Sequence, residues 1–178
     1  MEIKVDTTKL ATDLEKSAYE CFEQVICKQA QESFKQDGDL APMIFIGSSI
    51  GDNKIALFVM PVGEFMQCEQ SKEKLSTLMH KVGSKMEPVC ISMVTEAWMA
   101  HGDKDMIENG YKGSVKDMPG RIEVVICTFE SENIQRQKVY EIIRGKELEL
   151  KDISPSDDHE YSGKFVNMLK DMKKIKQN

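Results

Sequence analysis

The sequence predicts an α+β domain with a five-stranded, mainly antiparallel sheet, helices packed on one face, and the element order α-β-β-α-β-β-β-α. Apolar residues recur every three or four positions in three separate stretches, which indicates helices. Short β-branched and aromatic runs bounded by turn-forming residues indicate strands. The last three runs follow one another with only loops between them, which favours antiparallel pairing over repeated βαβ units.

The first expected element is a long amphipathic helix over residues 7–36, a stretch without Gly or Pro. Asp6 and Thr8 offer N-cap oxygens, and Gly38 lets the chain leave the other end. At 1.5 Å per residue, such a helix would be roughly 40 Å long. Because this exceeds what one face of a small sheet needs, we expect its far end to contact a second subunit.

Residues 43–48 and 54–61 predict a β-hairpin, since the segment between them is rich in turn formers. Both faces of the second strand are apolar, so we expect that strand to be central in the sheet. A second helix is expected within residues 65–86, best defined over 72–82, where apolar positions keep helical spacing.

The remaining strands are expected over residues 89–99, 121–130 and 137–144, and the last of them is open to a continuation through 147–152. The segment 153–163 predicts a linker within a single domain of 178 residues. It leads to a basic amphipathic helix over 164–175, whose apolar residues form one stripe.

Charge is uneven along the chain. The sequence carries 30 Asp and Glu against 24 Lys and Arg, a net charge of −6, yet residues 161–178 are basic. An acidic body argues against a broad nucleic-acid footprint, so a nucleic-acid partner is not expected. The lysines of the tail either contact phosphate or another anionic surface, or complement the helix dipole and the acidic body of their own fold.

Several classes of protein are disfavoured. The longest apolar runs, 43–46 and 55–60, are far short of the ~20 residues that span a bilayer, and the first residues lack a basic region followed by an apolar one. We therefore expect a cytoplasmic protein with no membrane partner. The five cysteines form no C-x-x-C pair and the three histidines are scattered, so neither a metal nor a cofactor is expected. No pattern indicates a catalytic residue.

A polar cluster is expected where two neighbouring strands meet. Strand alternation places Glu96 and Trp98 on one face, and an antiparallel return brings Arg121 and Glu123 near them. One interpretation is a ligand-binding pocket, with Trp98 as a flat wall, Arg121 as an anion clamp and a carboxylate as acceptor. The other is a structural cross-strand charge pair between Glu96 and Arg121, covered by a half-buried tryptophan.

The same segment carries a resemblance. The run T-E-A-W-M at residues 95–99, followed by a loop and by P-G-R-I-E-V-V at residues 119–125, resembles a group of uncharacterised bacterial and bacteriophage proteins. In that group a strand ending in E-A-W precedes a strand start of the form P-x-R-x-E. The resemblance covers about 30 residues and implies a small cytosolic α+β protein of a bacterium or its phage, with no assigned reaction.

Two functions from different classes follow. The first is a non-enzymatic binding or regulatory module that acts through protein–protein contacts. It would be a homo-oligomer through its first helix and meet a protein partner through the long loop 102–120 and the C-terminal helix. The second is a small enzyme or ligand-binding domain with its pocket at Glu96, Trp98, Arg121 and Glu123.

Overall fold

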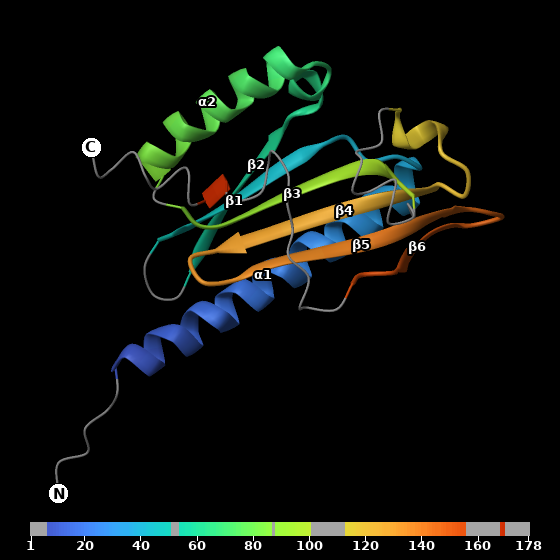
Figure 1. Ribbon diagram of the computed structural model, residues 1–178. Helices are drawn as coiled ribbons and strands as arrows, with labels where there is room; N and C mark the ends of the chain where they lie inside the picture. The colour runs from blue at the N-terminus through green and yellow to red at the C-terminus, as the bar shows by residue number, and fades with distance from the viewer. Residues whose placement is uncertain (1–6, 51–53, 87, 101–112, 156–167, 170–178) are drawn as a thin grey trace, which may run out of the picture.

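The computed structural model describes residues 7–50, 54–86, 88–100, 113–155 and 168–169. These residues form an α+β fold with one open sheet of six strands and two α-helices (Figure 1). The strand order across the sheet is β2-β1-β3-β4-β5-β6, and every pair of neighbours is antiparallel. The predicted fold class and antiparallel sheet are therefore confirmed.

The bounds of the elements are as follows. The helices are α1 (Thr7–Asp37), the 3₁₀ turn η1 (Gly63–Met66), α2 (Glu69–Met86) and the 3₁₀ turn η2 (Val115–Asp117). The strands are β1 (Met43–Ser49), β2 (Ile55–Pro61), β3 (Pro88–Met99), β4 (Ile122–Ser131), β5 (Gln135–Arg144) and β6 (Leu148–Asp152).

The prediction of five strands was wrong by one, because the chain reverses direction where a continuation was considered. Residues 145–147 form the turn, and β6 returns along β5 with Arg144 opposite Leu148. A three-residue connection of this kind is common in β-hairpins. The segment after β5 is thus a strand of its own at the edge of the sheet.

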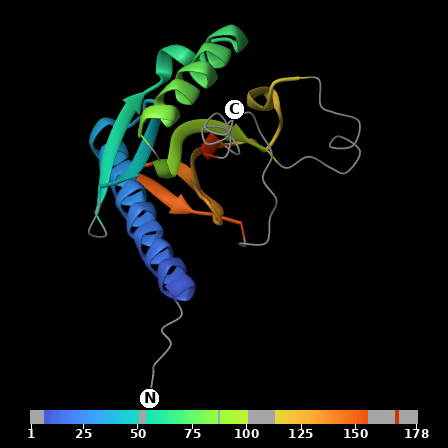
Figure 2. The ribbon, with the colours of Figure 1, turned by 90° about the vertical axis from the view of Figure 1, so that its left-hand side faces the viewer.

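The two helices lie on opposite faces of the sheet, which corrects the expectation that both would pack on one face (Figures 1 and 2). The reason lies in the central strand β3, whose two faces are both apolar. Cys90 and Val94 pack in the core under α1, whereas Ile91 and Met93 pack in the core under α2. A strand that is apolar on both faces needs cover on both.

The core under α1 joins the helix to four strands. Phe22 of α1 meets Phe129 of β4 edge to face, with ring centroids 6.4 Å apart. The buried members of this core are Tyr19, Phe22, Ile26, Ala30, Phe34, Leu40, Phe45, Cys90, Val94, Val125, Cys127, Phe129, Tyr140 and Ile142. Because α1 supplies five of these residues, it is part of the domain core along its second half.

The core on the other face is completed from the far end of the sequence. Met168 and Leu169 are helical and buried, and they pack with α2, β1 and β3. The backbone N–H of Leu169 donates a hydrogen bond of 2.9 Å to the buried Glu130 carboxylate of β4. Most of the predicted linker and C-terminal helix lies outside the described residues, but these two positions belong to the domain core.

The second strand of the hairpin is an edge strand, not a central one. β2 pairs with β1 and ends the sheet on that side, and it lies at the margin of the ribbon in Figure 2. Sequence alternation failed here because apolar residues on both faces of a strand are also compatible with an edge whose apolar side chains are left exposed. Leu57, Phe58 and Val59 are 42%, 49% and 51% exposed.

Candidate functional site

The structure brings the predicted cluster together on the α1 face of the sheet. Trp98 of β3 stands opposite Glu123 of β4 in the register, and Glu96 lies two residues before Trp98 on the same face. The guanidinium of Arg121, just before β4, lies 5.2 Å from the centroid of the Trp98 ring. This is a cation–π contact at a partly exposed position.

Glu96 binds the segment that leaves α1. The backbone N–H of Leu40 donates a hydrogen bond of 2.7 Å to Glu96 Oε1. Burial raises the pKa of Glu96, and the neighbouring Glu123 carboxylate acts in the same direction, while the Leu40 hydrogen bond opposes them. Glu96 therefore connects β3 to the C-terminal end of α1.

Arg144 at the end of β5 is the residue of this cluster that the sequence reasoning missed. Its Nε lies 3.0 Å from Glu123 Oε2, its Nη1 donates to the Gly38 carbonyl, and its guanidinium lies 5.5 Å from the centroid of the Phe34 ring. Alternation along β5 could have indicated the correct face, since Ile142 two residues earlier is a core residue. The register of β5 against β4 was not readable from the sequence.

The arginine that binds a carboxylate in this cluster is thus Arg144, whereas Arg121 stacks on Trp98 and donates a long hydrogen bond, 3.4 Å, to the Met118 carbonyl. The expected Glu96–Arg121 pair is replaced by a Glu123–Arg144 pair and a Glu96–backbone contact. These contacts tie β3, β4 and β5 to the end of α1. The geometry is that of a clasp between secondary structure elements.

A second feature is the free edge of β2. In the β1–β2 ladder, Val62 N–H donates to the Pro42 carbonyl and Ile50 N–H donates to the Lys54 carbonyl. Hydrogen-bonded pairs alternate along an antiparallel ladder, and the register has no shift between these two pairs. The backbone groups of the odd-numbered residues 55–61 therefore point away from β1.

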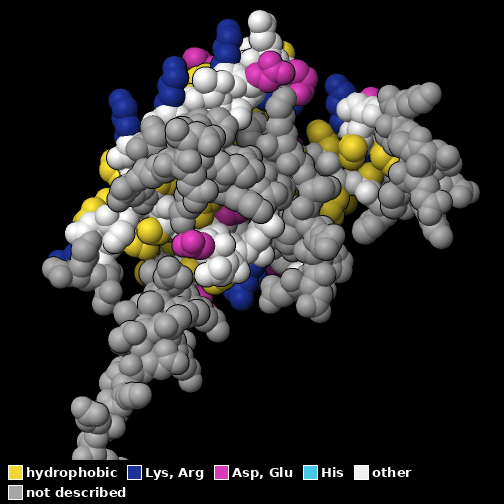
Figure 3. Space-filling view, turned by 60° about the vertical axis from the view of Figure 1, so that its left-hand side comes forward, with side chains coloured by type: hydrophobic (Ala, Val, Ile, Leu, Met, Phe, Trp, Pro, Cys, Tyr) yellow, Lys and Arg dark blue, Asp and Glu magenta, His cyan; other side chains and the backbone are white. Residues whose placement is uncertain are grey.

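Over residues 55–60, this edge carries none of the usual protection against pairing with another strand. Residues 55–61 contain no charged side chain, although edge strands are commonly guarded by lysines, bulges or short length. Pro61 lacks an N–H and stands at the end of the strand, where a proline is tolerated. In the space-filling view, hydrophobic side chains reach the surface below the basic side chains that project along α2 (Figure 3).

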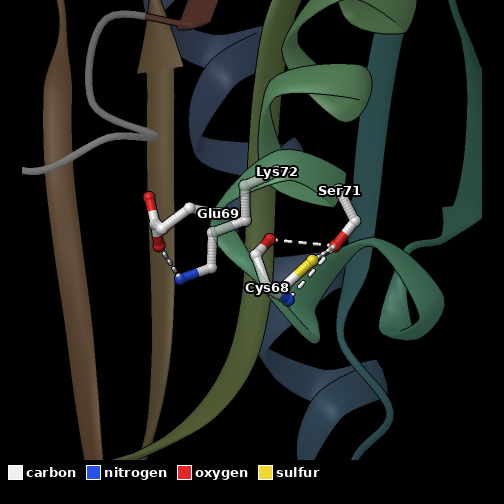
Figure 4. A network of polar contacts seen from close by, with 4 residues as sticks. All are labelled: Cys68, Glu69, Ser71 and Lys72. Atoms are coloured by element: carbon white, nitrogen blue, oxygen red, sulfur yellow. Dashed lines mark hydrogen bonds and ion pairs between the residues drawn. The ribbon is translucent and has the colours of Figure 1, made fainter.

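The start of α2 is closed by a polar cap (Figure 4). Ser71 Oγ accepts the N–H of Cys68 at 3.2 Å, donates to the Cys68 carbonyl at 2.9 Å, and lies 3.2 Å from the Cys68 sulfur. Lys72 Nζ and Glu69 Oε1 are 2.7 Å apart. The hydrogen bonds with Ser71 lower the pKa of the exposed Cys68 thiol. The bond from the Cys68 N–H to Ser71 Oγ satisfies a backbone donor at the start of α2.

The five cysteines differ in their exposure to solvent. Cys21 and Cys68 are exposed, while Cys90 and Cys127 are buried and Cys27 is half-buried. Three of the five therefore lie in or against the core under α1. All five are free thiols in the structure.

Two further findings concern only the residues that the structure describes. In that part of the chain, no three His, Cys, Asp or Glu side chains lie close enough to hold a metal ion. The described helices also include none that is long and apolar enough to cross a membrane. Most of the loop 102–120, from which a partner contact was expected, lies outside the described residues.

Comparison with known proteins adds no family: no protein-family model, curated protein or solved structure matches the chain. The likeness to bacterial and bacteriophage proteins around residues 95–125 stays a prediction.

Proposed function

We propose that the protein is a non-enzymatic interaction module that pairs with a second copy of itself through the edge of β2. The observation that carries the proposal is the exposed, uncharged edge strand, with Leu57, Phe58 and Val59 exposed together. An exposed, apolar strand edge is a ready template for another strand. Addition of a strand supplies main-chain hydrogen bonds and side-chain contacts at the same time.

A second copy fits this edge because the edge is self-complementary in the antiparallel sense. A register centred on Phe58 places Leu57 of one copy opposite Val59 of the other, and both residues have outward-facing backbone groups. The same register carries Lys54 of each copy to the far end of the other strand, so like charges do not meet. The resulting contact is isologous, as in most homodimers.

The uncharged side chains of β2 favour a second copy of the chain over a charged peptide as the partner. The edge offers seven residues without charge, so it has no side chain that would select an acidic or basic strand. Pairing of two such edges buries apolar surface on both sides of the joined sheet. Each Å² of apolar surface removed from water stabilises the dimer by roughly 25 cal/mol. The dimer would be a continuous sheet with β2 strands at its centre.

The test compares two matched substitutions. Val59→Lys places a charge on the β2 edge, and Val25→Lys places the same charge on α1, at a valine of almost equal exposure, 49% against 51%. We expect light scattering across a concentration series to show a dimer for the natural chain and for Val25→Lys, and a monomer for Val59→Lys. Circular dichroism checks that both variants keep the fold.

A monomeric natural chain at all concentrations would refute self-pairing. A dimer that is lost in Val25→Lys and kept in Val59→Lys would instead place the interface on α1, as the length of that helix led us to expect. Leu57→Pro provides a second variant, because it removes an outward N–H that β1 does not use. It should also give a monomer.

A second candidate function is binding of a small anion by Arg121, favoured by its exposed guanidinium over the ring of Trp98. Since Trp98 is the single tryptophan of the chain, its fluorescence reports directly on this position. Titration with acetate and with inorganic phosphate should change the emission of the natural chain in a saturable way, and leave that of Arg121→Ala unchanged. A linear response, equal in both proteins, would reject the site.

A further inference from the structure

The helix α2 concentrates positive charge on an acidic chain. It contains four lysines and two glutamates, whereas the whole chain has a net charge of −6. Lys72 forms an ion pair with Glu69 within the helix, at 2.7 Å. The other three lysines, Lys74, Lys81 and Lys85, are exposed.

These three lysines form one row along the helix. They stand seven and four residues apart, and the half-buried Leu78 lies between the first two at steps of four and three, a spacing that keeps side chains on one face. In the space-filling view, basic side chains project one after another along α2 (Figure 3). We call Lys74, Leu78, Lys81 and Lys85 the lysine row. At 1.5 Å per residue, it is about 17 Å long.

The lysine row lies on the flank of α2, beside the face that packs on the sheet. One residue corresponds to roughly 100° of turn around a helix. The two glutamates of α2, Glu69 and Glu73, fall outside the positions of the row. Each residue of the row is followed directly by one that packs in the core under α2, namely Leu75, Met79, Val82 and Met86.

We propose that the lysine row is a docking surface for an acidic amphipathic helix of a partner protein. Carboxylates of that helix face Lys74, Lys81 and Lys85. An apolar side chain of the same helix faces Leu78. The row is complete in one copy of the chain, so this interaction goes beyond pairing through β2 and does not depend on it.

The spacing within the row selects a helical partner. Steps of four, three and four residues are those of the seam along which two helices pack. Charged residues beside such a seam determine which partner binds and in which direction. Leu78 adds apolar contact within the row, where a helix packed against α2 meets it.

Two other kinds of polyanion fit the row less well. Recognition of an anionic bilayer typically takes a cluster of about four to eight basic residues, and the row has three lysines. A nucleic acid would bring a line of phosphates across a chain with a net charge of −6, so repulsion outside the row would oppose its binding. A short acidic helix can be confined to the row.

The test measures binding of synthetic acidic helices to the full chain. The probes are two fluorescently labelled peptides of alanine and glutamine, which carry glutamates and a leucine at the spacing of the row, one peptide for each direction of docking. Lys74→Glu with Lys85→Glu reverses charge in the row. Lys28→Glu with Lys35→Glu makes the same change on α1, where both lysines are also exposed. Lys85 and Lys35 each lie in the last turn of their helix.

We expect fluorescence anisotropy to show saturable binding of one peptide to the natural chain and to the α1 variant. Loss of one exposed charge pair weakens binding by about 1.5- to 5-fold. Because the α2 variant replaces two attractive pairs with repulsive ones, its binding should be about tenfold weaker or more. Added salt should weaken binding to the natural chain. Circular dichroism checks that both variants keep the fold.

Binding should persist in Leu57→Pro, which separates this surface from self-pairing through β2. The proposal is overturned if neither peptide binds saturably, if both double variants lose binding equally, or if a peptide with its glutamates spread around the helix binds as well. Tighter binding of a DNA duplex or of phosphatidylserine vesicles than of either peptide would also overturn it, because the row would then recognise that polyanion.

Discussion

At the scale of single residues, Gly47 occupies a position in β1 with no room for a side chain. A Cβ at this position would lie 2.4 Å from the Cys90 sulfur and 2.9 Å from a methyl carbon of Ile55. We expect Gly47→Ala to lower the free energy of unfolding by about 1–3 kcal/mol, as overpacking does in buried sites. Urea denaturation measures this loss.

The double-variant cycle with Cys90→Ala identifies the cause. If the clash with sulfur is responsible, Gly47→Ala should cost less in the Cys90→Ala background than in the natural chain. An equal cost in both backgrounds would place the strain at Ile55 instead.

Glu96 gives a prediction for pH. Its pKa in the folded chain is raised above the ordinary 4.5, chiefly by burial, so the folded chain holds this proton more tightly than the unfolded chain. The free energy of unfolding therefore falls as pH rises through the interval between the ordinary and the raised pKa. Glu96→Gln does not ionise and keeps an oxygen for the Leu40 N–H, so its stability relative to the natural chain should increase across this interval.

Urea titrations at a series of pH values between about 4 and 7 measure that relative stability. Glu147→Gln, which removes a carboxylate at an exposed turn position, is the comparison variant. A constant difference for Glu96→Gln would contradict the burial of its charge.

At the scale of elements, periodicity in the sequence predicts which segments are helices and strands better than it predicts how they are arranged in space. The hairpin of β1 and β2, both long helices and the three later strands were expected within a few residues of their observed bounds. What the sequence could not supply was placement: the edge position of β2, the opposite faces of α1 and α2, and the register that brings Arg144 to Glu123. Placement depends on contacts between distant segments, which local patterns do not contain.

The row of core residues along α1 makes a prediction for that helix. Ile26 is fully buried against the sheet, while its neighbour Val25 is 49% exposed. We expect Ile26→Ala to cost about 2–5 kcal/mol, and Val25→Ala to change the free energy of unfolding by less than about 0.5 kcal/mol. Equal effects in urea denaturation would mean that α1 does not hold its position on the sheet in solution.

At the scale of the whole molecule, the sheet has two cores that close in different ways. The core under α1 is covered by a single long helix, while the opposite core combines α2 with Met168 and Leu169. Leu169→Ala should therefore destabilise the entire fold by about 2–5 kcal/mol, and not only release a tail. Val89→Ala, at an exposed position of β3, is the control.

The informative comparison is between a probe of the α1 face and a probe of the whole chain in the same unfolding experiment. Emission from Trp98 reports on the α1 face, and far-ultraviolet circular dichroism reports on the whole chain. We expect both probes to shift to the same lower urea midpoint in Leu169→Ala, as a two-state transition requires. Separate midpoints would show that the α1 face does not unfold in one transition with the rest of the chain.

The buried Met168 and Leu169 also determine how late in synthesis the second core can be completed. The residues of the core under α1 lie between positions 19 and 150, whereas the other core needs positions 168 and 169. Since a domain folds as a unit, the fold is complete only when these two positions have emerged, and until then Ile44, Ile91 and their neighbours lack part of their cover. A nascent chain arrested before position 168 would leave that apolar surface open to chaperones, and its release would close it.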